Sequence, residues 1–121
     1  MNKQDFNNAI TQDIEMVKGD TLSFNFQLQG LEGAEPSIYF TCREHYNDAA
    51  PLFVSSYGYG IALEEYDEES DLATYSVRVD PIKTKSLNLG RYYYDLELRY
   101  GDDVLTLMRG RLSLVYEVTR G

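Results

Sequence analysis

The sequence predicts an all-β protein with one domain, and three observations support this prediction. Eleven tyrosines and five phenylalanines occur among 121 residues, and aromatic side chains pack well on the pleated surface of a sheet. Short runs alternate apolar with polar residues, which is the period of a half-buried strand. Turn residues separate these runs at the spacing of a sandwich or a barrel. At this length one compact core is expected.

The first twelve residues predict a flexible N-terminal arm. Residues 1–12 are polar, rich in Asn and Gln and weakly patterned, and the ends of a domain are often poorly ordered unless they are tied down. The alternative is an arm that orders on a neighbouring subunit. The folded domain is predicted over residues 13–121. No apolar signal-peptide core occurs near the N-terminus, so synthesis in a cytoplasm without a signal peptide is expected.

Two half-buried strands are predicted between residues 18 and 42. The turn signal "KGDT" (18–21) leads into a strand over 22–28, whose alternate residues share one face. Those inward residues are Leu22, Phe24, Phe26 and Leu28. Glycines and a proline then break the chain before a strand over 37–42. Its inward residues are Ile38, Phe40 and Cys42.

The middle of the chain predicts three further segments. Residues 52–56 form a strand, and residues 57–66 turn back on it through Gly58 and Gly60. An acidic run between residues 64 and 71 precedes a strand over 73–79, whose alternate residues Ala73, Tyr75, Val77 and Val79 share one face. Asp80 stands where an N-cap is expected and Pro81 at the first helical position. A short helical turn is therefore predicted to carry the chain from one sheet to the other.

The run "LNLGRYYYDLELRYGDD" (87–103) predicts the penultimate strand and a hairpin. Period-2 alternation over 91–100 places five residues on the inner face and makes Tyr93 outward and exposed. The inner residues are Tyr92, Tyr94, Leu96, Leu98 and Tyr100. "GDD" (101–103) closes the hairpin into the last strand.

The last strand, over 104–118, is long enough to bend. One parity contains Val104, Met108, Leu112, Leu114, Tyr116 and Val118. Leu105 and Leu107 fall on the other parity. This break predicts a β-bulge near residues 109–111, with Gly110 as the permissive residue.

About seven antiparallel strands with a short corner before the penultimate one favour an immunoglobulin-like β-sandwich. The spacing Asn88-x-Gly90-x-Tyr92 is that of a tyrosine corner, in which the tyrosine hydroxyl bonds to upstream backbone. Tyr94 occupies the place of the second cysteine of an antibody domain, and its ring is predicted to fill the core there. Gly90, Tyr92 and Tyr94 are thus the predicted structural corner.

Charge and composition argue against several functions. Twenty acids against eleven bases give a net charge of −9, which disfavours nucleic acid and membrane surfaces as partners. Cys42 is the only cysteine and is predicted to be a small buried hydrophobe. His45 is the only imidazole available to a catalytic triad, and we expect it in a surface loop. No catalytic residue, metal site or cofactor is predicted, and the protein is not expected to be an enzyme.

Two candidate binding features remain. The acids of residues 64–71 lack the twelve-residue calcium loop, so a solvated acidic loop is expected. The loop "YGYG" (57–60) places Tyr57 and Tyr59 with Tyr93 on a candidate interaction surface. These rings either stack on sugars, as in a carbohydrate-binding or adhesin-like module, or contact another subunit.

Several residues together resemble a known family. They are "KGDT" (18–21), Thr84, Leu87, Gly90, Tyr92, Tyr94, Asp95, Thr106, Gly110 and the closing "EVTR" (117–120). Over about residues 13–120 the chain resembles the N-terminal immunoglobulin-like domain of phage baseplate upper proteins and related small phage and prophage proteins. The resemblance implies a non-enzymatic virion structural protein of a tail, baseplate or fibre, made in the bacterial host. Its implied partners are other virion proteins and further copies of itself.

Overall fold

The computed structural model describes residues 9–116, and within them the chain forms nine strands and one short 3₁₀ turn, η2 (Pro81–Lys83). The all-β prediction is confirmed. The strands are β1 (Ile10–Thr11), β2 (Ile14–Val17), β3 (Leu22–Gln29), β4 (Ser37–Arg43), β5 (Phe53–Tyr57), β6 (Gly60–Asp67), β7 (Leu72–Val79), β8 (Gly90–Tyr100) and β9 (Asp103–Val115). The number exceeds seven because residues 10–17, for which no strand was predicted, contribute β1 and β2.

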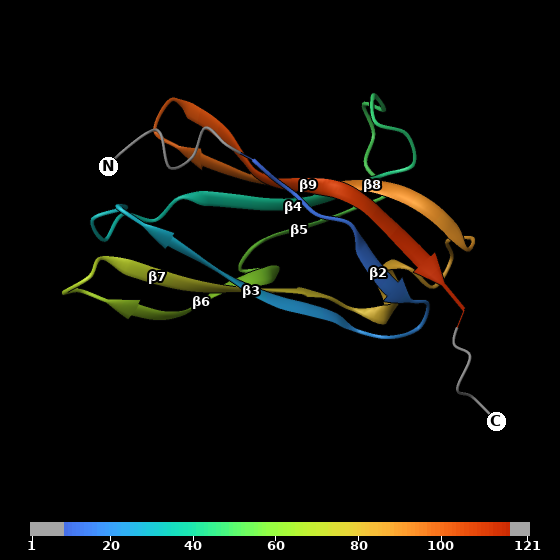
Figure 1. The fold of residues 1–121 in the computed structure, drawn as a ribbon, viewed down its shortest axis with the longest axis horizontal. Helices are drawn as coiled ribbons and strands as arrows, with labels where there is room; N and C mark the ends of the chain where they lie inside the picture. The colour runs from blue at the N-terminus through green and yellow to red at the C-terminus, as the bar shows by residue number, and fades with distance from the viewer. Residues whose placement is uncertain (1–8, 117–121) are drawn as a thin grey trace.

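The strands form one curled sheet in the order β1-β9-β8-β4-β5-β6-β7-β3, and β2 also pairs with β9. Figure 1 shows β4, β8 and β9 in one layer and β3, β6 and β7 in a second layer below it. Hydrogen bonding joins the layers through a short parallel pairing of β5 with β6, at Ser56 with Gly60 and Tyr57 with Ile61. The sheet therefore folds over on itself and encloses the core.

The prediction that residues 57–66 turn back on the preceding strand is wrong. β6 meets β5 only in the parallel pairs above and runs antiparallel to β7. Gly58 and Gly60 have positive φ of 87° and 104°, which glycine adopts without steric cost. A side chain at Gly60 would also lie 2.8 Å from the carbonyl oxygen of Arg78. These two glycines carry the chain into the second layer, where Ile61 is fully buried.

The core is built from the faces that the alternation predicted. Phe40 of β4 is fully buried at its centre. Its ring lies edge-on to Phe24 of β3 at 5.8 Å and stacks on Tyr94 at 5.3 Å and on Phe53 at 6.4 Å. In the lower layer, Phe26 of β3 stacks on Tyr75 of β7 at 5.4 Å. Contacts between aromatic rings therefore hold the two layers together.

The crossing from β7 to β8 contains the predicted helical turn and the hydrogen bond of a tyrosine corner. Asp80 is extended (φ −73°, ψ 153°) and Pro81 begins η2, as expected. The Asp80 carboxylate does not cap the turn, because it accepts from Arg78 Nε at 2.6 Å. The hydroxyl of buried Tyr92 donates to the carbonyl oxygen of Asn88 at 2.6 Å, and Gly90 has φ 150°.

Substitutions at Tyr92 test the corner. We expect Tyr92→Phe to lower the free energy of unfolding by about 1 kcal/mol, because one hydrogen bond is lost. Tyr92→Ala leaves a cavity as well, and a loss of about 3 kcal/mol is expected. Urea unfolding measures both values. Tyr93→Phe is the control, since that half-buried hydroxyl makes no hydrogen bond among residues 9–116. Equal and negligible losses for both Tyr92 variants would contradict the corner.

The predicted bulge lies elsewhere on the last strand. Residues 109–111 pair in regular register with Asp95, Tyr94 and Tyr93, and the register shifts at Leu107, between the pairs of Leu96 and Glu97. The extra residue reverses the alternation, so Leu105 packs against the core while Val104 is exposed. Tyr116 is exposed as well, contrary to the predicted parity. Val118 and the "EVTR" segment lie outside the described residues.

Gly110 has a different role, as the point where the N-terminal strands cross β9. β1 and β2 both pair with β9 in parallel. Between them, the Gln12 N–H donates to the Arg109 carbonyl at 2.9 Å, and the Gln12 carbonyl accepts from the Tyr94 hydroxyl. A Cβ at Gly110 would lie 2.1 Å from that Gln12 oxygen. Residues 10–12 thus belong to the sheet, whereas the sequence placed them in a flexible arm; residues 1–8 lie outside the described residues.

Candidate functional site

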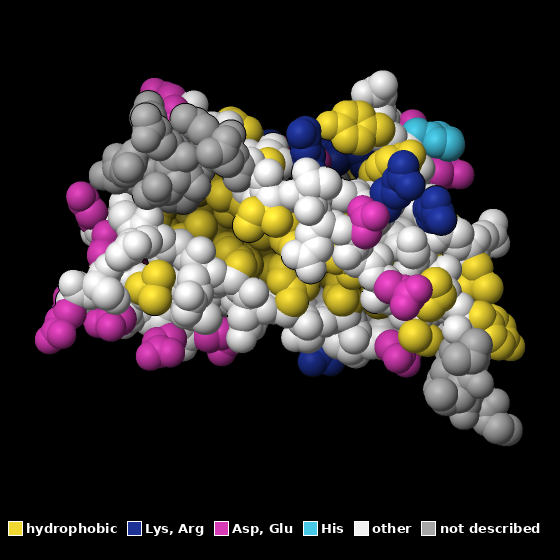
Figure 2. All heavy atoms as spheres, viewed as in Figure 1, with side chains coloured by type: hydrophobic (Ala, Val, Ile, Leu, Met, Phe, Trp, Pro, Cys, Tyr) yellow, Lys and Arg dark blue, Asp and Glu magenta, His cyan; other side chains and the backbone are white. Residues whose placement is uncertain are grey.

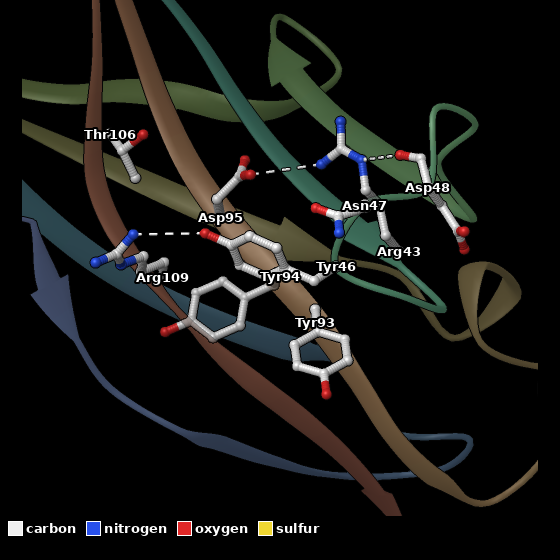
Figure 3. A pocket seen from close by; sticks show the side chains of 9 residues that line it. All are labelled: Arg43, Tyr46, Asn47, Asp48, Tyr93, Tyr94, Asp95, Thr106 and Arg109. Atoms are coloured by element: carbon white, nitrogen blue, oxygen red, sulfur yellow. Dashed lines mark hydrogen bonds and ion pairs between the residues drawn. The ribbon is translucent and has the colours of Figure 1, made fainter.

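The outer face of β4, β8 and β9 carries a hollow of about 310 Å³. It is lined by Arg43, Tyr46, Asn47, Asp48, Tyr93, Tyr94, Asp95, Thr106 and Arg109 (Figure 3). Strand alternation explains why polar groups gather here. Tyr93 and Asp95 flank the buried Tyr94, and Arg43 follows the buried Cys42. The loop between β4 and β5, residues 44–52, and strand β9 supply the remaining wall.

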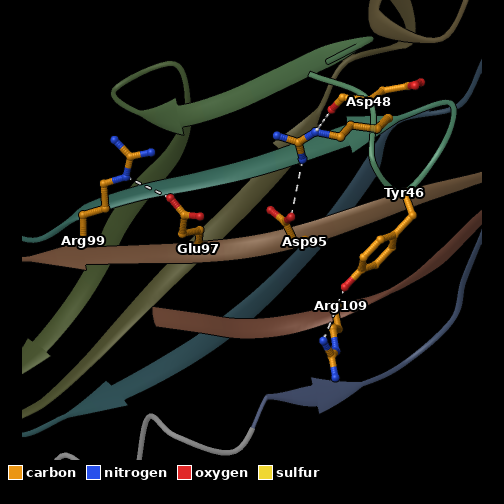
Figure 4. A network of polar contacts seen from close by, with 7 residues as sticks. Tyr46, Asp48, Asp95, Glu97, Arg99 and Arg109 are labelled. Atoms are coloured by element: carbon orange, nitrogen blue, oxygen red, sulfur yellow. Dashed lines mark hydrogen bonds and ion pairs between the residues drawn. The ribbon is translucent and has the colours of Figure 1, made fainter. Parts of the chain in front are cut away.

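Arg43 of β4 forms an ion pair with Asp95 of β8 and a hydrogen bond with the loop after β4 (Figure 4). Arg43 Nη1 lies 3.4 Å from Asp95 Oδ2, and Arg43 Nε donates to the carbonyl oxygen of Asp48 at 3.0 Å. Burial raises the pKa of Asp95 above its usual value, Arg43 opposes that shift, and Glu97 adds to it. Arg43 is therefore engaged in holding the loop against β8, and its charge is partly compensated.

Two tyrosine rings form the aromatic side of the hollow. Tyr46 lies edge-on to Tyr93, with ring centroids 6.0 Å apart and an angle of 88° between the planes. Arg109 Nη1 donates to the Tyr46 hydroxyl at 3.5 Å. Tyr93 is half-buried rather than exposed, because the Tyr46 ring of the loop packs on it.

Three exposed arginines extend from this hollow along β8 and β9. Arg109 pairs with Asp95, Arg111 with Tyr93 and Arg91 with Ser113 in the antiparallel register, so all three share the outer face. No carboxylate of residues 9–116 lies within ion-pair distance of them. We call Arg91, Arg109 and Arg111, with the Tyr46–Tyr93 pair, the arginine face. Figure 2 shows basic and apolar side chains together at the upper right, one group of acidic side chains at the lower left, and further acidic side chains near the basic ones.

The other two predicted surface tyrosines lie in a separate hollow. Tyr57 and Tyr59 line a depression of about 310 Å³ together with Tyr39. Tyr59 is 82% exposed, whereas Tyr57 packs edge-on against the buried Tyr75 at 6.2 Å. The guanidinium of Arg99 lies 5.0 Å from the centre of the Tyr39 ring. The structure therefore brings Tyr57 and Tyr59 together and places Tyr93 with different neighbours.

His45 is exposed in the loop after β4, as expected. Ligand atoms of Glu44, His45 and Asp48 lie within 4.8 Å of one another, and within residues 9–116 this is the one group of three that can hold a metal ion. Asp48 Oδ2 also accepts from the His45 backbone N–H at 3.0 Å, which is a local turn contact. Sequence reasoning missed this group, although the spacing Glu-His-x-x-Asp was visible.

The acidic run, predicted to be a solvated loop, is partly a strand. Its residues 64–67 belong to β6, and residues 68–71 form the turn into β7. The position of Cys42 agrees with prediction: the side chain is fully buried, and burial raises the pKa of its thiol to about 12 while Arg43 opposes the shift.

The comparisons with known proteins show no family for this chain. No family model matches the chain, and no curated protein sequence matches it. Among solved structures, the chain is similar to the crystal structure of the ZIG-8–RIG-5 IG1–IG1 heterodimer, with 14% identity and a TM-score of 0.39, over 90% of this chain and 85% of the other. Among residues 9–116, no helix has the length and apolar character to cross a bilayer.

Proposed function

We propose that this protein is a non-enzymatic structural protein of a phage or prophage virion, with an immunoglobulin-like fold, that acts through protein–protein contacts in a tail, baseplate or fibre. The two packed layers, the Tyr92 hydrogen bond to Asn88 and the parallel N-terminal strands support the fold assignment. The virion role follows from the sequence resemblance carried by residues such as Gly90 and Tyr94.

One observation carries the proposal of protein contacts. Exposed apolar side chains occur where β8 begins and β9 ends: Leu89 is 47% exposed and Tyr116 74% exposed, and the pairing of Gly90 with Leu114 places these two segment ends side by side. Ile82 of η2, in the crossing that leads into β8, is 71% exposed. We call Ile82, Leu89 and Tyr116 the apolar end. Exposed apolar patches of this kind mark surfaces that meet another protein.

Self-association tests the proposal. We expect the purified protein to form multimers in size-exclusion chromatography with light scattering, and Ile82→Ser combined with Leu89→Ser to reduce the multimer fraction at least several-fold. Val104→Ser is the control, since Val104 is exposed to 61% in the turn region at the other end of β9. If the double variant forms the same multimer as the wild type, the apolar end is not the surface through which the copies meet.

The second candidate function is a carbohydrate-binding or adhesin-like module, favoured by the hollow that Tyr39, Tyr57 and Tyr59 line. Exposed tyrosine rings stack on sugar rings through their apolar faces. This alternative predicts a monomer that binds on a glycan array and loses binding with Tyr59→Ala. Tyr116→Ala, which removes an equally exposed ring elsewhere, is the matched control.

A further inference from the structure

We propose that the arginine face of one copy binds the acidic edge of a second copy, so that the protein associates head to tail. The inference rests on the proposed role in assembly and names the surfaces that meet. The acidic edge is the outer side of β6 and the turn that follows it, with the side chains of Glu64, Glu65, Asp67, Glu68 and Glu69.

The arginine face is a local exception on an acidic protein. The chain carries a net charge of −9 and has seven arginines, yet three of them lie together on β8 and β9, and no carboxylate of residues 9–116 forms an ion pair with their guanidinium groups. Within that range, the Asp13 carboxylate accepts only from the backbone N–H of Arg111, at 3.0 Å. The planar guanidinium group presents a fork of donors that matches a carboxylate in a bidentate geometry. The Tyr46–Tyr93 pair and the hollow beside Arg109 give this surface a shape that can receive a side chain.

Among residues 9–116, no ion pair neutralises the carboxylates of the acidic edge. Residues 62–70 are all exposed, and none of the acids from residue 64 to residue 71 forms an ion pair with Lys or Arg within residues 9–116. Glu64 accepts from the Ser76 hydroxyl at 2.7 Å, and Asp67 accepts from the Glu69 N–H at 3.1 Å. Glu65 and Glu68 make no such contact within the described part of the chain. The carboxylates repel one another, and a cationic partner would relieve that repulsion.

Backbone pairing leaves this edge accessible. β6 pairs with β5 only at Gly60 and Ile61, so residues 62–67 have no strand on their outer side among residues 9–116. Charged side chains keep such an edge from pairing with unrelated strands. They also restrict its partners to surfaces of opposite charge, and the arginine face is such a surface on the same protein.

The two surfaces lie at different places on the molecule, as Figure 2 shows for the basic and acidic side chains, and they are not copies of each other. Their contact is therefore heterologous, and it generates a ring if the rotation closes or an open filament if it does not. A nucleic acid is disfavoured as the occupant, because the net charge of the protein repels phosphate.

Complementary charge reversals test the proposal. One variant carries Arg109→Glu and Arg111→Glu, which makes both surfaces negative. The second carries Glu65→Lys, Glu68→Lys and Glu69→Lys, which leaves two acids against three lysines on the acidic edge and so makes both surfaces positive. Each variant alone is expected to lose at least ten-fold in self-association by light scattering at about 50 mM salt, where surface charges are weakly screened. An equimolar mixture restores assembly, because each surface then meets its opposite. The wild-type assembly is expected to weaken as salt rises.

Arg78→Glu with Arg99→Glu is the matched control, since it changes the net charge by the same amount as the arginine variant, at two exposed arginines outside the arginine face and the apolar end, and is expected to leave assembly unchanged. A multimer that resists charge reversal but dissolves on Ile82→Ser with Leu89→Ser overturns this inference and leaves the proposed function standing. A wild-type protein that is monomeric at low salt overturns both. If the wild type binds nucleic acid and the arginine variant does not, the arginine face binds nucleic acid and not a second copy of the protein, and the inference is wrong.

Discussion

Phe40→Ala is expected to lower the free energy of unfolding by about 4 kcal/mol, at the upper part of the range for a buried phenylalanine. The Phe40 ring is fully buried and contacts Phe24 of the facing layer as well as Phe53 and Tyr94 of its own. Its removal leaves a cavity that three large rings border, and these rings are fixed by strands on both layers. The free energy of unfolding of a domain is only about 5–15 kcal/mol, so this loss would be a large part of the total. Urea unfolding followed by far-ultraviolet circular dichroism measures the loss.

Phe40→Leu is the matched control for this prediction. It keeps an apolar side chain between the layers, and we expect it to lose about 1.5 kcal/mol, the range of volume-conserving changes in a core. A Phe40→Ala protein as stable as Phe40→Leu would mean that the layers close over the missing ring. In that case Phe40 would not be the centre of the core.

Gly110→Ala is expected to cost about 3 kcal/mol, at the upper end for an overpacked core position. The added Cβ would lie 2.1 Å from the Gln12 carbonyl oxygen, which is backbone and has no rotamer by which to move away. Relief requires the crossing segment to leave β9 and the Tyr94 hydroxyl to lose its acceptor. Hydrogen exchange should therefore accelerate at the Gln12 N–H, which donates to Arg109.

Gly101→Ala separates this clash from a general glycine effect. Gly101 has φ 59° with no atom within 4 Å of a built Cβ, so the change brings only backbone strain of about 1 kcal/mol. It should leave exchange at Gln12 unaltered. Wild-type stability and unaltered exchange in Gly110→Ala would show that the N-terminal segment does not cross β9 at this glycine.

The faces of the strands over 22–28, 37–42, 73–79 and 91–100 could be predicted because alternation is local. A residue such as Phe24 or Leu96 turns inward as a consequence of strand geometry and of the two-residue period. The helical turn after Asp80 was predictable for the same reason, since Pro81 fixes its own φ. The hydroxyl of Tyr92 reached Asn88 because the corner spans only four residues.

Features that depend on distant segments could not be predicted in this way. Sequence reasoning singled out Gly110, but the neighbour that requires it, Gln12, is far away in the chain. The bulge at Leu107 and the crossing of residues 57–60 to the second layer likewise depend on how the layers pack. Alternation shows which side chains of a strand face the core, but it does not show which strand lies beside it.

The candidate site shows the same contrast between local features, which could be predicted, and contacts between distant segments, which could not. Tyr57 and Tyr59 were predicted to lie together from one short loop, whereas Tyr93 was assigned to the same surface by exposure alone. Its neighbours are Tyr46 from the loop after β4 and the arginines of β9. A signal was available: the hairpin at residues 101–103 places Arg109 and Arg111 opposite Asp95 and Tyr93 once the extra residue Leu107 is counted.

The parallel pairing of residues 10–17 with β9 also has a consequence for biosynthesis. The ribosome releases this early segment long before the segment that holds it, residues 108–115, has been translated. Until then the Gln12 N–H has no acceptor on β9, and the emerging polypeptide presents unsatisfied strand backbone. Pairing of β1 and β2 with β9 must therefore be a late step in the formation of the sheet.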